Sequence, residues 1–225
     1  MTANRTEDQW EDLYRSGPGA PKYPNGHVVR WLFGSFPRAR AADFHLLDMG
    51  CGMGRHAVMM KREGYGVSAT DYSAAAIDQA IKWTGGIDID FRQAPADKQP
   101  FPDRSFDGIL SYAVLYYLPL EKMQQAFREI RRLLKPGGRS FVMIKNNRDI
   151  RVSKGEEVAP HHYIITRKDS GMPWNNEQNM QLTLLPRQEV EEICRDFSKV
   201  VINEMTGTLD GGRFLEAAWL ISLTR

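Results

Sequence analysis

Three glycines at every second position follow a short hydrophobic segment in "LLDMGCGMGRHA", residues 46–57. Glycine adopts positive φ angles without strain and leaves room for a neighbouring group, so such a cluster indicates a sharp turn or a close backbone approach. Asp48 precedes Gly50, Gly52 and Gly54, and Cys51 stands between the first two. In open α/β sheets, ligands bind beyond the carboxyl ends of strands, where a loop of this kind would lie.

The spacing of the glycines leaves several types of site open. The pattern is G-x-G-x-G. A dinucleotide-binding loop, G-x-G-x-x-G, would have its third glycine at the position of Arg55. No G-K-[ST] sequence follows, which excludes a Walker-type phosphate-binding loop. A strand-to-helix turn without any ligand fits as well. Asp71 ends the next predicted strand, about 20 residues past the loop, where a carboxylate can accept hydrogen bonds from a ribose. Its alternative role is to cap the following helix, which Ser73 can also do.

Segments with strand and helix patterns alternate over most of the chain, which predicts an α/β fold with a parallel sheet. We expect strands at 45–50, 66–71, 87–94, 106–114 and 139–144, and helices at 54–64, 73–84 and 119–134. The tail predicts a helix at 187–197 and two consecutive strands at 199–205 and 217–224. Consecutive strands of this kind indicate an antiparallel edge on a mostly parallel sheet.

Two further regions are expected to cover the carboxyl ends of the strands. Residues 1–43 predict a helical cover with helices at 6–16, which Thr6 would cap, and at 26–36. Residues 145–186 are polar and rich in Gly and Pro, and they are too long for an ordinary connection. We expect an irregular insertion or lid there, with 145–175 forming a mobile cover, within a single domain spanning 1–225.

Composition indicates the cellular compartment and the kinds of binding partner. The 225 residues carry a net charge of +2, with 42% hydrophobic and 26% charged residues, so no strong field favours nucleic acid or membrane. The chain lacks an apolar run long enough for a membrane span, and its first residues are unlike a signal peptide. Two cysteines make a disulfide framework unlikely to form, and we expect no metal site. These features predict a cytoplasmic protein without a nucleic-acid or membrane partner.

The glycine segment, "VSATDYS", "QPFPDRSFDGILSYAVLYYL" and "RLLKPGGRSFVMI" together resemble the class I S-adenosylmethionine-dependent methyltransferases over about residues 44–144. The resemblance implies a Rossmann-like, doubly wound sheet of seven strands, mostly parallel with an antiparallel edge strand. It also implies S-adenosylmethionine as cofactor and S-adenosylhomocysteine as product. This cofactor has no pyrophosphate, so a third glycine at the dinucleotide spacing is not needed.

The resemblance also assigns cofactor contacts. Asp48 would orient the loop or the methionine amino group, Asp71 would accept the ribose hydroxyls, and Cys51 would be an inert filler. The cofactor-binding residues expected in full are Tyr14, Asp48, Gly50, Cys51, Gly52, Gly54, Asp71, Tyr72, Ala96, Asp97 and Ser111. Pro95 replaces an aspartate common in the family, so the adenine contact rests on Ala96 and Asp97. A solvated turn is the alternative for Asp97.

The acceptor is expected beyond strand 106–114. Tyr112, Tyr117 and Tyr23 can contact a substrate, while Tyr116 is a candidate catalytic residue, and at least one of Tyr116 and Tyr117 is expected to pack inward. Trp10 is interpreted as simple packing. His161 or His162 can serve as general base, since in an extended segment only one of two adjacent side chains points inward. The alternative is a pair of surface histidines.

The substrate's charge is predicted from three cations after strand 139–144, of which at least one should face the cleft. Lys145, Arg148 and Arg151 would favour an acceptor with a carboxylate or phosphate. The alternative is a solvated loop balanced by Asp149, Glu156 and Glu157. The predicted function is methyl transfer to an oxygen or nitrogen of a small-molecule metabolite. The sequence "SYAV" stands where amino-methylating nucleic-acid enzymes of this fold commonly carry [DNS]-P-P-[YFW]. A non-catalytic S-adenosylmethionine-binding protein and an NAD-dependent oxidoreductase are the alternatives.

Overall fold

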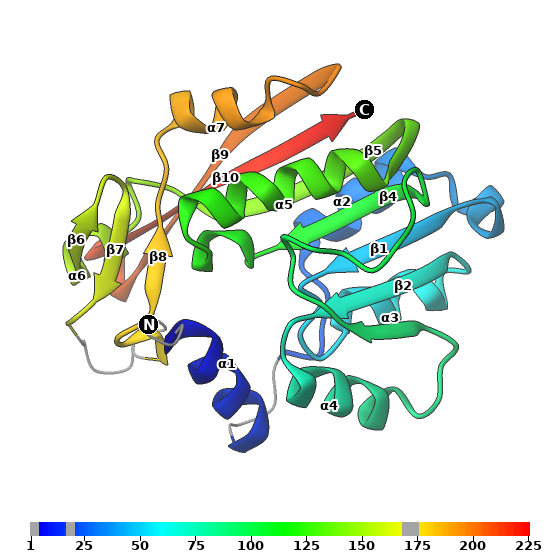
Figure 1. The fold of residues 1–225 in the computed structure, drawn as a ribbon, viewed down its shortest axis with the longest axis horizontal. Coiled ribbons are helices and arrows are strands. Elements are labelled where there is room, and N and C mark those ends of the chain that lie inside the picture. The colour runs from blue at the N-terminus through cyan, green and yellow to red at the C-terminus, as the bar shows by residue number, and fades with distance from the viewer. Residues whose placement is uncertain (1–4, 17–20, 168–175) are drawn as a thin grey trace.

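A computed structural model of the chain describes residues 5–16, 21–167 and 176–225. Its main feature is a seven-stranded sheet in the order β3-β2-β1-β4-β5-β10-β9 (Figure 1). The strands are β1 (His45–Met49), β2 (Gly66–Asp71), β3 (Asp90–Gln93), β4 (Phe106–Tyr112), β5 (Leu134–Lys145), β9 (Lys199–Leu209) and β10 (Phe214–Thr224). β1 to β5 pair in parallel, whereas β10 runs antiparallel to both β5 and β9. The predicted seven-stranded, mostly parallel sheet is confirmed, and the antiparallel strand lies between β5 and the edge strand β9.

Helices cover both faces of this sheet, and their ends follow local sequence signals. The helices are α1 (Arg5–Ser16), α2 (Gly26–Ser35), α3 (Arg55–Arg62), α4 (Ala74–Thr84), α5 (Leu120–Leu133), α6 (Arg151–Lys154) and α7 (Arg187–Cys194), with short 3-10 turns at Arg38–Asp43, Leu115–Tyr117 and Asp210–Gly212. Ser73 caps α4 by accepting a hydrogen bond from the Ala76 amide, and Gly64 takes a φ of 94° after α3. Figure 1 shows α5 in front of β5 and α2 behind it.

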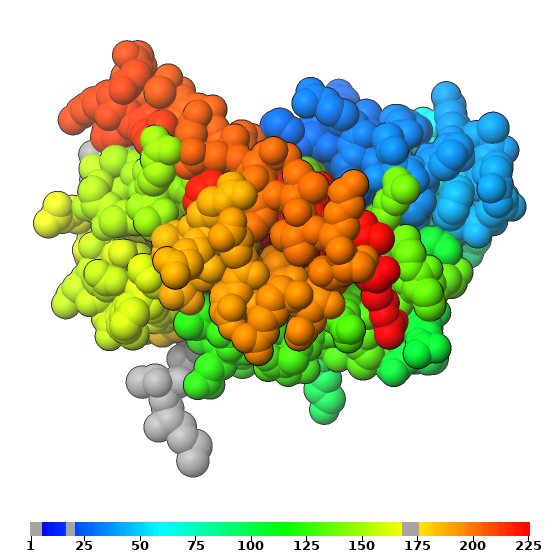
Figure 2. All heavy atoms as spheres, turned by 90° about the horizontal axis from the view of Figure 1, so that it is seen from above, coloured from blue at the N-terminus to red at the C-terminus, as the bar shows by residue number. Residues whose placement is uncertain are grey.

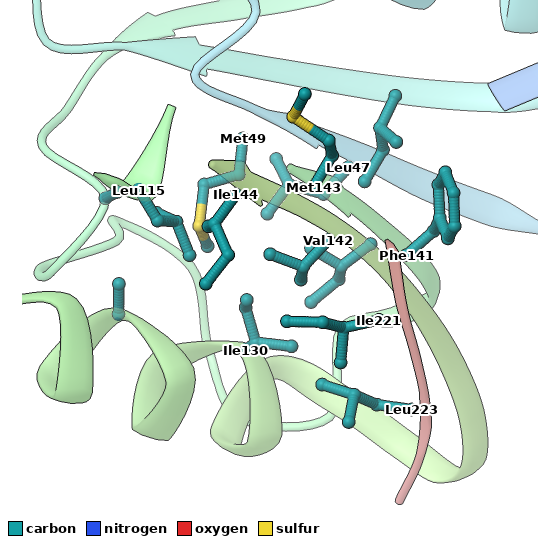
Figure 3. Close-up of a cluster of buried hydrophobic side chains, with 14 of the residues drawn as sticks. Leu47, Met49, Leu115, Ile130, Phe141, Val142, Met143, Ile144, Ile221 and Leu223 are labelled. Atoms are coloured by element: carbon teal, nitrogen blue, oxygen red, sulfur yellow. The ribbon is translucent and has the colours of Figure 1, made fainter. Parts of the chain in front are cut away.

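The core lies between β1, β5, β10 and α5. Figure 3 shows Leu47 and Met49 of β1, Val142 and Ile144 of β5 and Ile130 of α5 directed toward one another, and all five are buried. Strands of a parallel sheet that is covered on both faces are hydrophobic on both sides, which explains why these segments lack a polar alternation. This core fixes the carboxyl ends of β1 and β4 at one edge.

The region expected to be irregular contains a second, three-stranded antiparallel sheet in the order β6-β7-β8, so that expectation was wrong. Its strands are β6 (Gly155–Ala159), β7 (His162–Ile165) and β8 (Gln181–Thr183). Tyr163 and Ile165 alternate with more exposed neighbours and join the hydrophobic core together with Leu182 of β8, which is the physical reason for regular strands here. Figure 2 shows these yellow-green residues at one end of the molecule, beside the orange α7 and β9 region.

Several element boundaries also differ from expectation. α1 begins at Arg5, and the Thr6 hydroxyl accepts a hydrogen bond from the Gln181 amide of β8 at 2.9 Å instead of capping its own helix. β5, β9 and β10 are longer than predicted, because pairing with neighbours extends them into polar sequence. Among the described residues, the helices are too short or too polar to cross a bilayer.

Candidate active site

The loop between β1 and α3 requires glycine for both backbone and space. Gly50 and Gly52 have φ angles of 75° and 54°, which residues with a Cβ rarely adopt. A Cβ on Gly50 would lie 2.5 Å from the Val114 side chain, and one on Gly52 would lie 2.6 Å from the Tyr14 hydroxyl. The glycines therefore let a side chain that follows β4 and one from α1 approach the loop closely.

Two buried carboxylates hold the loop in place. Asp48 accepts a hydrogen bond from the Ala57 amide of α3 at 3.1 Å. Asp71 accepts one from the Gly52 amide at 2.8 Å and one from the Ser73 amide at 3.0 Å. Burial raises the pKa of Asp48 to about 7 and that of Asp71 to about 6, although the amide donors oppose this rise. Asp71 thus serves the loop and the start of α4 at once.

A cavity of about 200 Å³ lies against this loop, at the carboxyl ends of β1, β2 and β4. α1 contributes to its wall, and Figure 1 shows α1 and the β6-β8 sheet at the end toward which β1, β2 and β4 point. The predicted residues that line this cavity are Tyr14, Gly50, Cys51, Gly52, Asp71, Tyr72, Ala96, Tyr112 and Tyr117. Cys51 is buried, and burial raises the pKa of its thiol, so the thiol stays protonated and unreactive at neutral pH.

Other predicted contacts lie outside the cavity wall. Gly54 starts α3 and Ser111 is buried inside β4, while Asp97 lies half-buried in the turn after β3. Asp48 lies behind the loop, where its carboxylate accepts the hydrogen bond from the Ala57 amide of α3. Tyr116 is buried, with its hydroxyl 3.1 Å from that of Tyr117, and Tyr23 is 85% exposed. The structure therefore places these side chains outside the cavity that α1 covers.

The structure corrects the placement of Lys145 and Arg148. The Lys145 ammonium is buried and lies 3.1 Å from Asp149 and 3.0 Å from Glu216. The Arg148 guanidinium pairs with Glu204 of β9 at 2.7 Å. Neither residue lines the cavity, because acidic partners from the following turn and from β9 and β10 bind both cations. They give no support to an anionic acceptor.

The two histidines of the insertion are also outside the cavity. His161 occupies the turn between β6 and β7 with a φ of 60°, and its backbone amide donates to Glu157. The His162 ring nitrogen Nδ1 lies 3.1 Å from the Thr183 hydroxyl of β8. Burial lowers the pKa of His162, so its ring is neutral. The β6-β8 pairing directs both residues elsewhere, and the expectation that one of them faces the cleft was wrong.

Residues that sequence reasoning did not assign to the cavity also line it. Trp10 packs edge-on against Tyr117, with ring centroids 5.1 Å apart, so it does more than pack as interpreted. His56 accepts a hydrogen bond from the Asn25 amide at 3.3 Å, and burial lowers its pKa to about 3. Arg55 and His56 directly follow the glycine loop, at the start of α3, which is a signal that could have identified them.

Comparison with known proteins agrees with this geometry. Residues 47–142 match the family model of a methyltransferase domain. The chain is 33% identical over 166 residues to a sterol 4-C-methyltransferase of Caenorhabditis elegans, covering 67% of this chain and 48% of that protein. It is 29% identical over 143 residues to a tRNA N(3)-cytidine methyltransferase of Danio rerio, covering 57% and 40%. The chain therefore spans about half or less of the length of these curated relatives.

A solved S-adenosylmethionine-dependent methyltransferase of Methanosarcina mazei has the same fold, with a TM-score of 0.66 at 19% identity. The alignment covers 89% of this chain and 98% of that one. The strand order, the glycine loop and the carboxylate at the end of β2 have the arrangement of the Rossmann-like methyltransferase fold. Residues 47–142 therefore form a methyltransferase domain with the fold of the class I S-adenosylmethionine-dependent methyltransferases, the class whose cofactor is S-adenosylmethionine.

Proposed function

We propose that the protein transfers a methyl group from S-adenosylmethionine to an oxygen or nitrogen of a small molecule. The observation that carries this proposal is the cavity of about 200 Å³, which α1 covers with Trp10 and Tyr14. A cavity of this kind suits a small acceptor better than a folded nucleic acid. The named relatives act on sterols and on tRNA, so they do not decide between substrate classes.

The lining residues fit the cofactor. Asp71 offers carboxylate oxygens for the ribose hydroxyls, the loop from Gly50 to Gly52 admits close approach, and Ala94 and Ala96 offer apolar contacts for the adenine. When bound, the cofactor supplies an electrophilic methyl group on a sulfonium. The protein's own work is to align acceptor and methyl group and to exclude water. α1 does the latter by closing the cavity.

We further propose that residues 1–225 act as one domain in which 1–43 cover the cofactor and 145–186 act as a lid; of these two regions, residues 1–4, 17–20 and 168–175 lie outside the described residues. Support comes from hydrogen bonds between the two regions: Gln9 donates to the Gln178 carbonyl at 2.8 Å, and Thr6 accepts from Gln181.

We also propose a cytoplasmic location. Both cysteines, Cys51 and Cys194, are free and buried, which agrees with a reducing compartment.

Calorimetry and a turnover assay test the function. We expect S-adenosylhomocysteine to bind with a Kd on the order of micromolar, about −8 kcal/mol. A panel of small amines, alcohols, phenols and carboxylic acids is then assayed by formation of S-adenosylhomocysteine, with unmodified tRNA and a sterol as competing classes. Turnover of tRNA alone would contradict the small-molecule proposal, methylation of a sterol carbon alone would contradict oxygen or nitrogen as the acceptor atom, and absence of binding would contradict the cofactor site.

A further inference from the structure

A chain of hydrogen-bonded side chains leads from the cavity wall into the insertion. Tyr117 lines the cavity, and its hydroxyl donates to the Glu177 carboxylate at 2.7 Å. The Tyr117 hydroxyl oxygen also accepts a hydrogen bond from the Tyr116 hydroxyl at 3.1 Å. Glu177 directly precedes the residues that bond to α1, so this chain connects the cavity to the second sheet.

Buried charges fix the direction of these hydrogen bonds. The Arg151 guanidinium donates to Glu177 and, at 3.0 Å, to Asp149. Asp149 in turn binds Lys145 at 3.1 Å and the Ala217 amide at 2.9 Å. The side chains of these four charged residues are at most 8% exposed. An arginine has donors only, and Glu177 accepts from Arg151 with one carboxylate oxygen and from Tyr117 with the other.

The proton of the Tyr117 hydroxyl is therefore committed to Glu177. A phenolic oxygen has two lone pairs, and Tyr116 uses one of them. No hydrogen bond among the described residues uses the second lone pair, so it can accept from a donor brought to Tyr117 in the cavity wall. A carboxylate brought to the same place would meet this lone pair and the Glu177 carboxylate behind it.

We propose, building on the function proposed above, that Tyr117 positions the methyl acceptor and presents to it a lone pair rather than a proton. The acceptor is then a neutral group with an N–H or O–H bond, not a carboxylate. Tyr117 touches the acceptor, whereas Glu177 and Arg151 are positioning residues that set the polarity of its hydroxyl. This role replaces the one expected for Lys145 and Arg148.

Glu177→Gln reverses this polarity without changing the shape of the side chain. Arg151 can bond only to an acceptor, so the glutamine oxygen faces Arg151 and its NH₂ group faces Tyr117. The Tyr117 oxygen then accepts from glutamine, and its proton turns toward the cavity or toward Tyr116. The double variant Glu177→Gln with Tyr116→Phe removes the second choice. Both variants keep the tyrosine ring in the cavity wall.

The probes are aniline, phenol and benzoate, which share one ring and differ in the group that they offer. In wild type we expect kcat/KM for aniline or phenol to exceed that for benzoate by about tenfold or more. Benzoate has no N–H or O–H group to donate to the Tyr117 oxygen and therefore loses at least one hydrogen bond. In Glu177→Gln, and more so in the double variant, this ratio should fall by about tenfold. Tyr117→Phe should abolish the preference. The matched control is Glu156→Gln, an exposed insertion residue outside the chain of hydrogen bonds.

Each result bears on the proposal. A wild-type preference for benzoate would overturn it and point to Arg55 as the residue that orients the acceptor. A Glu177→Gln ratio within about twofold of wild type would also overturn it, provided that calorimetry shows unchanged binding of S-adenosylhomocysteine. If Glu177→Gln fails to fold by circular dichroism, Tyr117→Phe decides. Binding of S-adenosylhomocysteine without turnover of any small molecule overturns the proposed function, and the role of Tyr117 falls with it.

Discussion

Gly50 joins two demands at one residue, a left-handed backbone and contact with Val114. Either demand alone would tolerate an alanine with some adjustment, but together they leave no compensating movement, since Val114 is branched at Cβ and stiff. We therefore expect Gly50→Ala to lower the free energy of unfolding by about 2 kcal/mol, the combined cost of a positive φ and a contact that is too short. Urea denaturation measures this effect.

Gly207→Ala is the control for this substitution. No atom lies within 4 Å of a Cβ built on Gly207, and its φ is not in the left-handed region. Its free energy of unfolding should stay within about 0.5 kcal/mol of wild type. Equal effects of the two substitutions would show that the close approach of Val114 does not matter.

Asp71 carries two bonds to the backbone before any ligand binds. We expect Asp71→Asn to weaken binding of S-adenosylhomocysteine by roughly 1.5–3 kcal/mol, the range for hydrogen bonds to a charged group. The isosteric amide keeps the shape and one acceptor oxygen, and its NH₂ group faces one of the two backbone amides, so the loss reports the charge together with that backbone bond. Titration calorimetry at neutral pH tests this, and an unchanged Kd would exclude the ribose role of Asp71.

Helix α1 is attached to the rest of the molecule through polar contacts at both ends. The Glu11 carboxylate accepts from the Ser73 hydroxyl at 2.6 Å and from the Ala75 amide at 3.3 Å, at the N-terminus of α4. This bond to Ser73 lowers the pKa of Glu11. A carboxylate at a helix N-terminus also interacts favourably with the helix dipole.

Glu11→Gln keeps the size of the side chain and removes its charge. We expect about 1 kcal/mol weaker docking of α1, and hence roughly fivefold faster release of S-adenosylhomocysteine in stopped-flow measurements. Asp12→Asn on the same helix is the control, because the Asp12 side chain is 75% exposed. Identical release rates for wild type and both variants would mean that α1 does not limit release.

The β6-β8 sheet is expected to change its order with ligand. It is a small sheet whose first strand is largely exposed, and small sheets of this size have little stability of their own. Amide hydrogen exchange over Gly155–Ile165 should slow on addition of S-adenosylhomocysteine. Equal, strong protection with and without this ligand would refute the prediction of a lid.

Local signals explain which elements could be predicted. The strands β1, β2 and β4 and the loop at Gly50 follow from short hydrophobic runs and clustered glycines, which act within a few residues. Lys145 pairs with the nearby Asp149 but also with Glu216, and Arg148 pairs with Glu204; both glutamates lie far along the chain. A charge cluster read in sequence looks free when its partners arrive from distant strands. The same holds for Trp10, whose contact with Tyr117 depends on the docking of α1.

Across the whole molecule, the titration of buried groups sets how stability depends on pH. Burial raises the pKa of Asp48 to about 7, whereas a carboxyl of this type in an unfolded chain has a pKa of about 4. Between these values the folded protein binds more protons than the unfolded chain. The contribution of the protonated Asp48 carboxyl to the free energy of unfolding is therefore complete below about pH 4 and is lost as the pH rises through about 7.

His56 has the opposite effect, since burial lowers its pKa to about 3, so the difference between two proteins is the informative quantity. We expect the free energy of unfolding of wild type, relative to Asp48→Asn, to fall by up to about 1.4 kcal/mol per pH unit between pH 4 and 7. Urea denaturation of the cofactor-free proteins at several pH values measures it. A difference that does not vary with pH would contradict the raised pKa of Asp48.

The position of β10 between β5 and β9 has a consequence for biosynthesis. Leu223 pairs with Ser140 and Thr224 with Arg139, so one side of β5 receives its partner only after residues 214–224 have left the ribosome. Until then the nascent chain carries β5 as an open edge, which can pair with other chains. A programmed pause in translation before these residues would lengthen this exposure, whereas the glycine loop and β1 to β4 can assemble earlier. Completion of the sheet therefore waits for the emergence of β10.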